Sequence, residues 1–139
     1  MKHERIIFLD IDGVICTRKT RYRSLDEECV TILKRITDDT DAAIVISSSW
    51  KYSHKLNQFQ DMLGKFGISR VIGVTPNLDG DWVRGQEIEK WIKENPSTKS
   101  FVILDDDSDM EPLMERLVQT DCEFGLTDKD ADKAIDMLK

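Results

Sequence analysis

The sequence has few cysteines, few histidines and no long apolar run, and each shortage excludes a class of protein. Three cysteines and two histidines in 139 residues, with no CxxC pair, favour neither a disulfide framework nor a zinc site. No apolar stretch approaches the roughly 20 residues of a membrane-spanning helix. The first one ends after four residues at Asp10, unlike a signal peptide. We therefore expect a cytoplasmic protein whose thiols stay reduced.

Positive charge is also scarce, which argues against a general nucleic-acid binder. The chain has 20 basic and 27 acidic side chains and a net charge of −7. The balance is +2 over residues 1–70 and −9 over residues 71–139. Four of the early positive charges lie together in the segment 18–23, RKTRYR. This segment either guides a polyanion or is a solvated loop that offsets nearby acids.

Length and composition indicate one globular domain over residues 1–139. A chain of this length buries a core without disulfides, and 40% hydrophobic residues are enough to form one. Short apolar runs, which suit strands buried on both faces of a parallel sheet, alternate with amphipathic segments. The predicted strands are 6–9, 42–46, 71–74, 101–104 and, more weakly, 122–124. We expect an α/β fold, a three-layer Rossmann-like sandwich around a mainly parallel five-stranded sheet.

Five segments between these runs carry apolar residues at helical spacing. They are residues 29–36, 56–66, 88–92, 110–117 and 131–138. Ser24, Asp26 and Asp128 stand where N-caps are expected, and Gly67 follows the second helix as a stop signal.

Three of the predicted strands end in chemically reactive groups. Asp10 and Asp12 follow the first strand, three serines follow the second, and a run of aspartates from Asp105 follows the fourth. Ligands of open α/β sheets bind at the carboxyl ends of the strands. Carboxylates that converge there repel one another unless a cation joins them, and an all-oxygen ligand set suits Mg²⁺. A phosphate site built on magnesium is therefore expected at this edge.

The stretch 8–15, FLDIDGVI, resembles the first motif of the haloacid dehalogenase (HAD) superfamily of phosphohydrolases. The stretches 44–48, IVISS, and 102–106, VILDD, resemble later motifs in the expected order. The resemblance covers nearly the whole chain. Ser-Ser-Trp, the Arg84-Gly85 helix start and the 125–127 ending are similar to small members related to nucleic-acid-repair phosphatase domains.

The resemblance implies a division of labour among the acids. Asp10 is expected to be the nucleophile that forms an aspartyl-phosphate. Asp12 is expected to protonate the leaving oxygen and then to activate water. The Mg²⁺ site is expected to use the carboxylate of Asp10, the backbone carbonyl of Asp12, and Asp105 and Asp106, of which either one contacts the ion directly. Asp109 is a weaker candidate.

Two positions leave alternatives open. Alignment by the strand end favours Ser47 as the hydroxyl that binds phosphate, whereas alignment by Trp50 favours Ser48, which we prefer. The family usually has a lysine at the start of the third helix, but this chain has Arg84, whose fork also binds phosphate. Arg84 could instead pair with Glu87 or Glu89 on the surface, and Lys90 is the fallback.

The expected function is a magnesium-dependent phosphatase. No cap domain fits between the motifs, which resembles members that act on bulky or macromolecular phosphates or that borrow a neighbouring subunit as a lid. The expected partner is a phosphorylated small molecule or a nucleic-acid end, and the substrate is expected to be a nucleotide or a polynucleotide terminal phosphate. The alternatives are a phosphotransferase or mutase that uses the same intermediate, and a non-catalytic magnesium-binding regulatory module. Intact Asp10 and Asp12 argue against the last of these.

Overall fold

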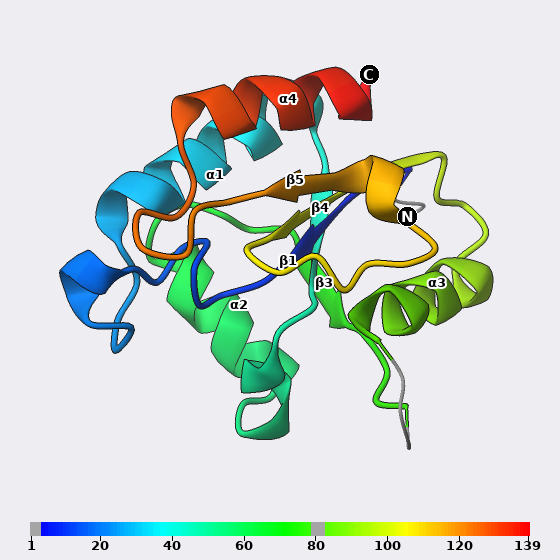
Figure 1. Ribbon diagram of the computed structural model, residues 1–139, viewed down its shortest axis with the longest axis horizontal. Coiled ribbons are helices and arrows are strands. Elements are labelled where there is room, and N and C mark those ends of the chain that lie inside the picture. The colour runs from blue at the N-terminus through cyan, green and yellow to red at the C-terminus, as the bar shows by residue number, and fades with distance from the viewer. Residues whose placement is uncertain (1–3, 79–82) are drawn as a thin grey trace.

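The computed structural model describes residues 4–78 and 83–139, and its centre is a five-stranded sheet in which all the strands are parallel (Figure 1). The strand order is β3-β2-β1-β4-β5. The bounds are β1 Arg5–Leu9, β2 Ala43–Ile46, β3 Val71–Val74, β4 Ser100–Asp105 and β5 Leu117–Gln119. The helices are α1 Glu27–Thr40, α2 Leu56–Gly64, α3 Arg84–Glu94 and α4 Asp128–Leu138. This arrangement confirms the expected α/β sandwich.

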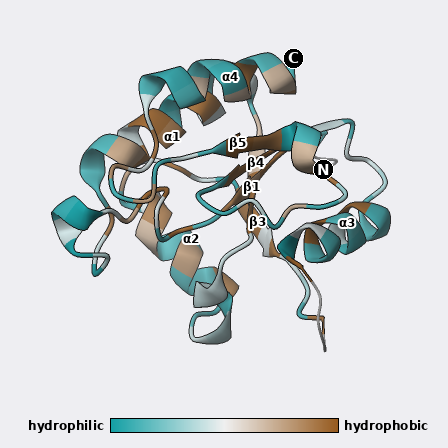
Figure 2. Ribbon diagram, in the orientation of Figure 1, coloured by the Kyte–Doolittle hydropathy of each residue, from teal (hydrophilic) through white to brown (hydrophobic). Residues whose placement is uncertain are grey.

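The helices cover both faces of the sheet, so each strand is buried on two sides. One hydrophobic cluster joins alternate strand residues such as Ile7 and Ile44 to α1, α2 and α4. The second joins Phe8 and Val45 to α3 on the opposite face. Figure 2 shows the strands as largely hydrophobic ribbon, with hydrophilic residues on the outer sides of α3 and α4. The continuous apolar runs of the sequence follow from this double burial.

The strand order changes direction at the central strand β1, because β2 and β3 follow on one side of it and β4 and β5 on the other. β1 pairs with β2 on one side, Leu9 opposite Ile46, and with β4 on the other, Leu9 opposite Leu104. α1 and α2 lead outward to β2 and β3, and α3 then crosses the other face to reach β4. Ligands of open parallel sheets bind at such a switch point, at the carboxyl ends of the strands.

Two of the predicted elements are wrong. The predicted helix 110–117 is instead a turn, a short 3₁₀-helix Met114–Arg116 and the start of β5. Pro112 lies in this segment; it has no N–H to donate and disfavours helical backbone at the residue before it. The predicted strand 122–124 is a turn, because Asp121 Oδ1 accepts hydrogen bonds from the backbone N–H groups of Glu123 and Phe124 (2.8 and 3.3 Å). The fifth strand forms earlier, at Leu117–Gln119.

The helix signals are otherwise close to the structure. Asp26 caps α1 by accepting a hydrogen bond from the N–H of Glu28, and Gly67 has a positive φ of 83° after α2. The cap of α4 is Thr127, one residue before the predicted Asp128.

No cap domain covers the carboxyl edge of the sheet in the described parts of the chain. The only helix between β1 and α1 is the 3₁₀-helix η1 (Arg18–Thr20), and the only one between β2 and α2 is η2 (Ser49–Tyr52), both within the described residues. Across residues 4–78 and 83–139, every helix is too short or too polar to span a lipid bilayer.

Candidate active site

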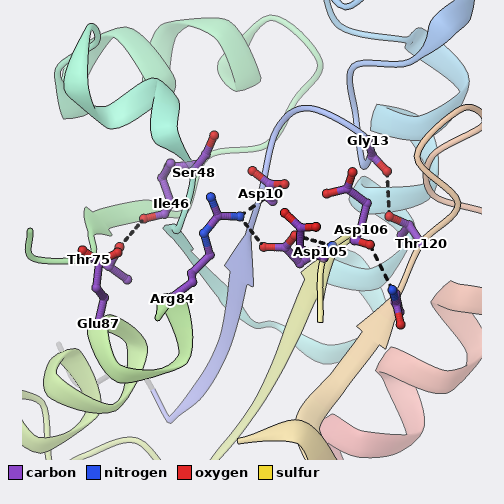
Figure 3. Close-up of polar contacts among 12 residues, drawn as sticks. Asp10, Gly13, Ile46, Ser48, Thr75, Arg84, Glu87, Asp105, Asp106 and Thr120 are labelled. Atoms are coloured by element: carbon purple, nitrogen blue, oxygen red, sulfur yellow. Dashed lines mark hydrogen bonds and ion pairs between the residues drawn. The ribbon is translucent and has the colours of Figure 1, made fainter. Parts of the chain in front are cut away.

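Three aspartates meet at the switch point, where β1 and β4 end. Asp10 directly follows β1, Asp105 is the last residue of β4 and Asp106 is the next (Figure 3). One carboxylate oxygen from each lies within 4.8 Å of the others. The N–H of Asp10 donates to the carbonyl of Leu104 (3.0 Å), so the sheet ladder itself holds the two strand ends together. Asp10 is 5% exposed and Asp105 is fully buried.

The buried negative charge in this cluster is incompletely neutralised. Burial, and next the charge of Asp105, raise the pKa of Asp10 to about 8, although Arg84 opposes the shift. Burial likewise raises the pKa of Asp105 to about 6, against the lowering effects of Arg84 and of the Asp107 backbone N–H. Both carboxyls would ionise at ordinary pH if a cation joined them. Three convergent hard oxygen donors are the ligand set that Mg²⁺ prefers, so the residues fit this ion.

Arg84 supplies the positive charge that the cluster does have. It is the first residue of α3, and its Nη1 donates to Asp105 Oδ2 (2.6 Å) and lies 3.5 Å from Asp10 Oδ2. Burial alone would lower the pKa of Arg84, but Asp105 and Asp10 together raise it. Arg84 thus points into the cluster and not toward Glu87 or Glu89. Lys90 pairs instead with Glu94 on the surface of α3 (3.9 Å).

Two glycines allow close packing at the site, one against the cluster itself and one against a neighbouring turn. Gly13 has a φ of 80°, and a Cβ there would overlap the Asp106 carboxylate. A Cβ at Gly85 would overlap the backbone of Met110 and Glu111, so α3 begins against that turn. Asp109 takes no part in the carboxylate cluster, and its carbonyl accepts a hydrogen bond from the N–H of Gly85 (3.1 Å).

Asp12 has different surroundings from the other acids. Trp50 Nε1 donates to Asp12 Oδ2 (3.1 Å), while Asp12 Oδ1 is buried without a partner in the described residues. The three-carboxylate cluster does not include the Asp12 side chain. One oxygen of Asp12 is therefore held by Trp50, and the other is buried without a hydrogen bond to the described residues.

The two candidate serines, Ser47 and Ser48, are both buried but differ in their bonding. Ser47 is 1% exposed, and its Oγ has no partner among the described residues. Ser48 Oγ accepts a hydrogen bond from the Trp50 N–H (3.2 Å) and so caps the 3₁₀-helix η2. An accepting hydroxyl keeps its own proton, so Ser48 can still donate to a phosphate.

A buried ion pair beside the site escaped the sequence analysis. Lys51 Nζ lies 2.9 Å from Glu87 Oε1, and both side chains are almost fully buried. Lys51 also donates to Thr75 Oγ1 (3.1 Å), and Glu87 Oε2 accepts from the N–H of Leu78 (3.2 Å). The pair joins the loop after β2 to α3. Figure 3 shows Glu87 on α3 beside Thr75. The feature of the sequence that could have pointed to Glu87 is its position one helical turn after Arg84, which places both side chains on the same side of the helix.

The basic segment 18–23 is partly neutralised by nearby acids. Arg18 pairs with Glu123 (3.5 Å) and Lys19 with Glu28 (2.9 Å), which offsets nearby acids. Arg21 and Arg23 form no ion pair within the described part of the chain.

Residues 6–131 match a family model described as the HAD domain in Swiss Army Knife RNA repair proteins. The match covers most of the 139-residue chain and includes every aspartate of the cluster, together with Asp12, the serines and Arg84. No curated protein matches the chain.

Proposed function

The chain belongs to the HAD domain family of Swiss Army Knife RNA repair proteins, and from this premise we propose that it is a magnesium-dependent phosphatase with Asp10 as its nucleophile. The observation that carries the proposal is the convergence of Asp10, Asp105 and Asp106 within 4.8 Å beside Arg84. A phosphate monoester is an anion, and it needs positive charge wherever buried carboxylates surround its binding site. Arg84 supplies part of that charge.

Asp10 attacks first. Its carboxylate oxygen forms a bond to phosphorus, and the bond between phosphorus and the leaving oxygen breaks. The leaving oxygen takes a proton from Asp12, whose Oδ1 has no partner among the described residues. Water then attacks the aspartyl-phosphate while Asp12 takes a proton back. Inorganic phosphate leaves, and Asp10 is regenerated.

Mg²⁺ held by Asp10, Asp105, Asp106 and the Asp12 carbonyl would offset the negative charge of the acids and of the phosphate. Arg84 and a serine hydroxyl orient the phosphoryl oxygens. We assign that hydroxyl to Ser48, which the Trp50 N–H holds in place. The unpartnered Ser47 hydroxyl is a second donor to the same group.

The family description names RNA repair, which favours a phosphorylated nucleic-acid end or a nucleotide as the substrate. The uncovered carboxyl edge of the sheet also suits a bulky phosphate ester. A phosphotransferase would need an acceptor other than water. Release of free phosphate without an added acceptor therefore identifies a phosphatase.

The first prediction concerns the nucleophile. Asp10→Asn removes the oxygen nucleophile but keeps the shape of the side chain, so phosphate release should fall at least about a thousandfold. Asp12→Asn should still allow slow formation of the aspartyl-phosphate, because it removes only the proton donor. Phosphate release from a terminally phosphorylated oligonucleotide with Mg²⁺ measures the first effect, mass spectrometry of the phosphorylated protein measures the second, and circular dichroism checks the fold. An Asp10→Asn variant that keeps a tenth of the activity would contradict the proposal.

A further inference from the structure

A cavity next to the proposed general acid has the chemistry of a binding site. Its volume is about 420 Å³, and it lies between α2 and the segment that leads into α1. Its apolar lining comes from Trp50, Leu25, Met62 and Phe66. A volume of several hundred Å³ with an aromatic wall is typical of small-molecule sites.

Trp50 connects this cavity to the reaction. Its indole Nε1 donates to Asp12 Oδ2 (3.1 Å), and its ring also lines the cavity. His54 stacks on Trp50 with ring centroids 5.1 Å apart and an angle of 23° between the planes. In the proposed mechanism Asp12 protonates the leaving oxygen. Trp50 thus contacts both Asp12 and the cavity, so a leaving group held against its ring is one side chain away from the acid.

The rim of the cavity is positively charged. Arg23 and Lys65 line it and are exposed, and among its eight lining residues, all within the described chain, Glu27 is the only acid. Neither Arg23 nor Lys65 is in an ion pair within the residues described. Two uncompensated cations beside an aromatic wall suit a base joined to a further phosphate.

A larger cavity lacks this character. It measures about 720 Å³ and is lined by Asp26, Glu28, Glu123 and Asp128. Its two basic residues, Arg18 and Lys19, already pair with Glu123 and Glu28. An anionic ligand is therefore favoured at the smaller cavity.

We propose that the cavity lined by Trp50, Arg23 and Lys65 binds the leaving group of the substrate, a nucleoside that carries a second phosphate. The base packs against Trp50, and the second phosphate lies between Arg23 and Lys65. A terminal nucleotide of a strand has this composition, since its phosphodiester supplies the second phosphate. The assignment rests on the proposed phosphatase function and adds the substrate class.

Binding can be tested without turnover, in the Asp10→Asn protein with Mg²⁺. Adenosine 3′,5′-bisphosphate and inorganic phosphate are titrated separately by calorimetry. Adding Arg23→Gln and Lys65→Gln should lower the affinity for the bisphosphate by at least about tenfold more than the affinity for inorganic phosphate. The matched control, Lys129→Gln with Lys133→Gln, removes two exposed charges from α4 and should change the affinity for the bisphosphate less than about twofold.

The indole N–H resonance of Trp50 gives a second readout. It is identified by its loss in Trp50→Phe, and it should shift when the bisphosphate binds but not when inorganic phosphate binds. Equal weakening of both ligands, or a Trp50 resonance that the bisphosphate leaves unmoved, would overturn the assignment. Hydrolysis of acetyl phosphate by the unsubstituted protein is measured alongside. If it is absent, the phosphatase proposal fails as well; if it is present, only the cavity assignment fails.

Discussion

Asp10 is held in surroundings that favour its neutral form, although the proposed nucleophilic attack on phosphorus requires its ionised form. Its folded-state pKa of about 8 lies above the ordinary value of 3.8, chiefly because it is buried and next because Asp105 is close. A carboxyl with a raised folded pKa stabilises the fold at low pH, and this contribution is lost as the pH rises toward the folded value. Asp105, with a pKa of about 6, acts in the same direction.

The melting temperature without metal should therefore fall between about pH 4 and pH 8, apart from the contributions of other groups. Asp10→Asn should remove much of this slope and raise the melting temperature at pH 8 in chelator by several degrees. Magnesium should stabilise the unsubstituted protein most at pH 8, because it binds the ionised carboxylates of the folded form. Thermal unfolding in chelator and in Mg²⁺ across this pH range measures both effects. Equal slopes for the two proteins in chelator would refute the electrostatic account.

At the scale of elements, α3 positions Arg84, and the start of α3 depends on close packing. A Cβ at Gly85 would overlap the backbone of Met110 and Glu111. Gly85→Ala should therefore destabilise the protein by about 2 kcal/mol or more and displace Arg84, lowering the phosphatase rate. Gly64→Ala is the matched control, because nothing lies within 4 Å of a Cβ there and alanine favours helix. Urea unfolding and phosphate release should separate the two variants; similar results for both would contradict the packing argument.

The Lys51–Glu87 pair connects the loop after β2 to the same helix. Removing one partner leaves a buried charge alone, so Lys51→Met should cost about 3 kcal/mol of stability. Lys51→Met with Glu87→Leu should cost less than the single change, since no unpaired charge is left. A double-mutant cycle in urea measures the difference. Additive losses would show that the two groups do not interact.

Elements buried on both faces could be predicted from the sequence, and elements set by loop chemistry could not. The apolar runs of β1 to β4 are visible in the sequence because both faces of these strands are covered. The segment between β4 and β5 has helical spacing of apolar residues, but Pro112 prevents a helix there. The acids were expected at one place because parallel strands end at one edge. The Trp50–Asp12 and Lys51–Glu87 contacts depend on the path of a loop that no periodicity encodes.

Over the whole molecule, the site draws on segments that are far apart in the chain. Asp10 and Asp105 are separated by most of the sequence, and β1 joins them through its ladder to β4. Arg84 reaches them only when α3, which begins with this residue, packs on the opposite face of the sheet. The carboxylate cluster and Arg84 therefore come together only when β1, β4 and α3 are all in place, whereas β1, α1 and β2 form a more local unit.

This topology makes one backbone amide a reporter of site assembly. The N–H of Asp10 is bonded to the carbonyl of Leu104, across the strand pair that forms only when distant parts of the chain meet. Its exchange with solvent deuterium requires the nucleophile to separate from β4, and so tracks the opening of the centre itself. Helix fraying elsewhere leaves that hydrogen bond intact. The lifetime of the assembled catalytic centre can thus be followed at a single proton, in a protein that is performing no chemistry.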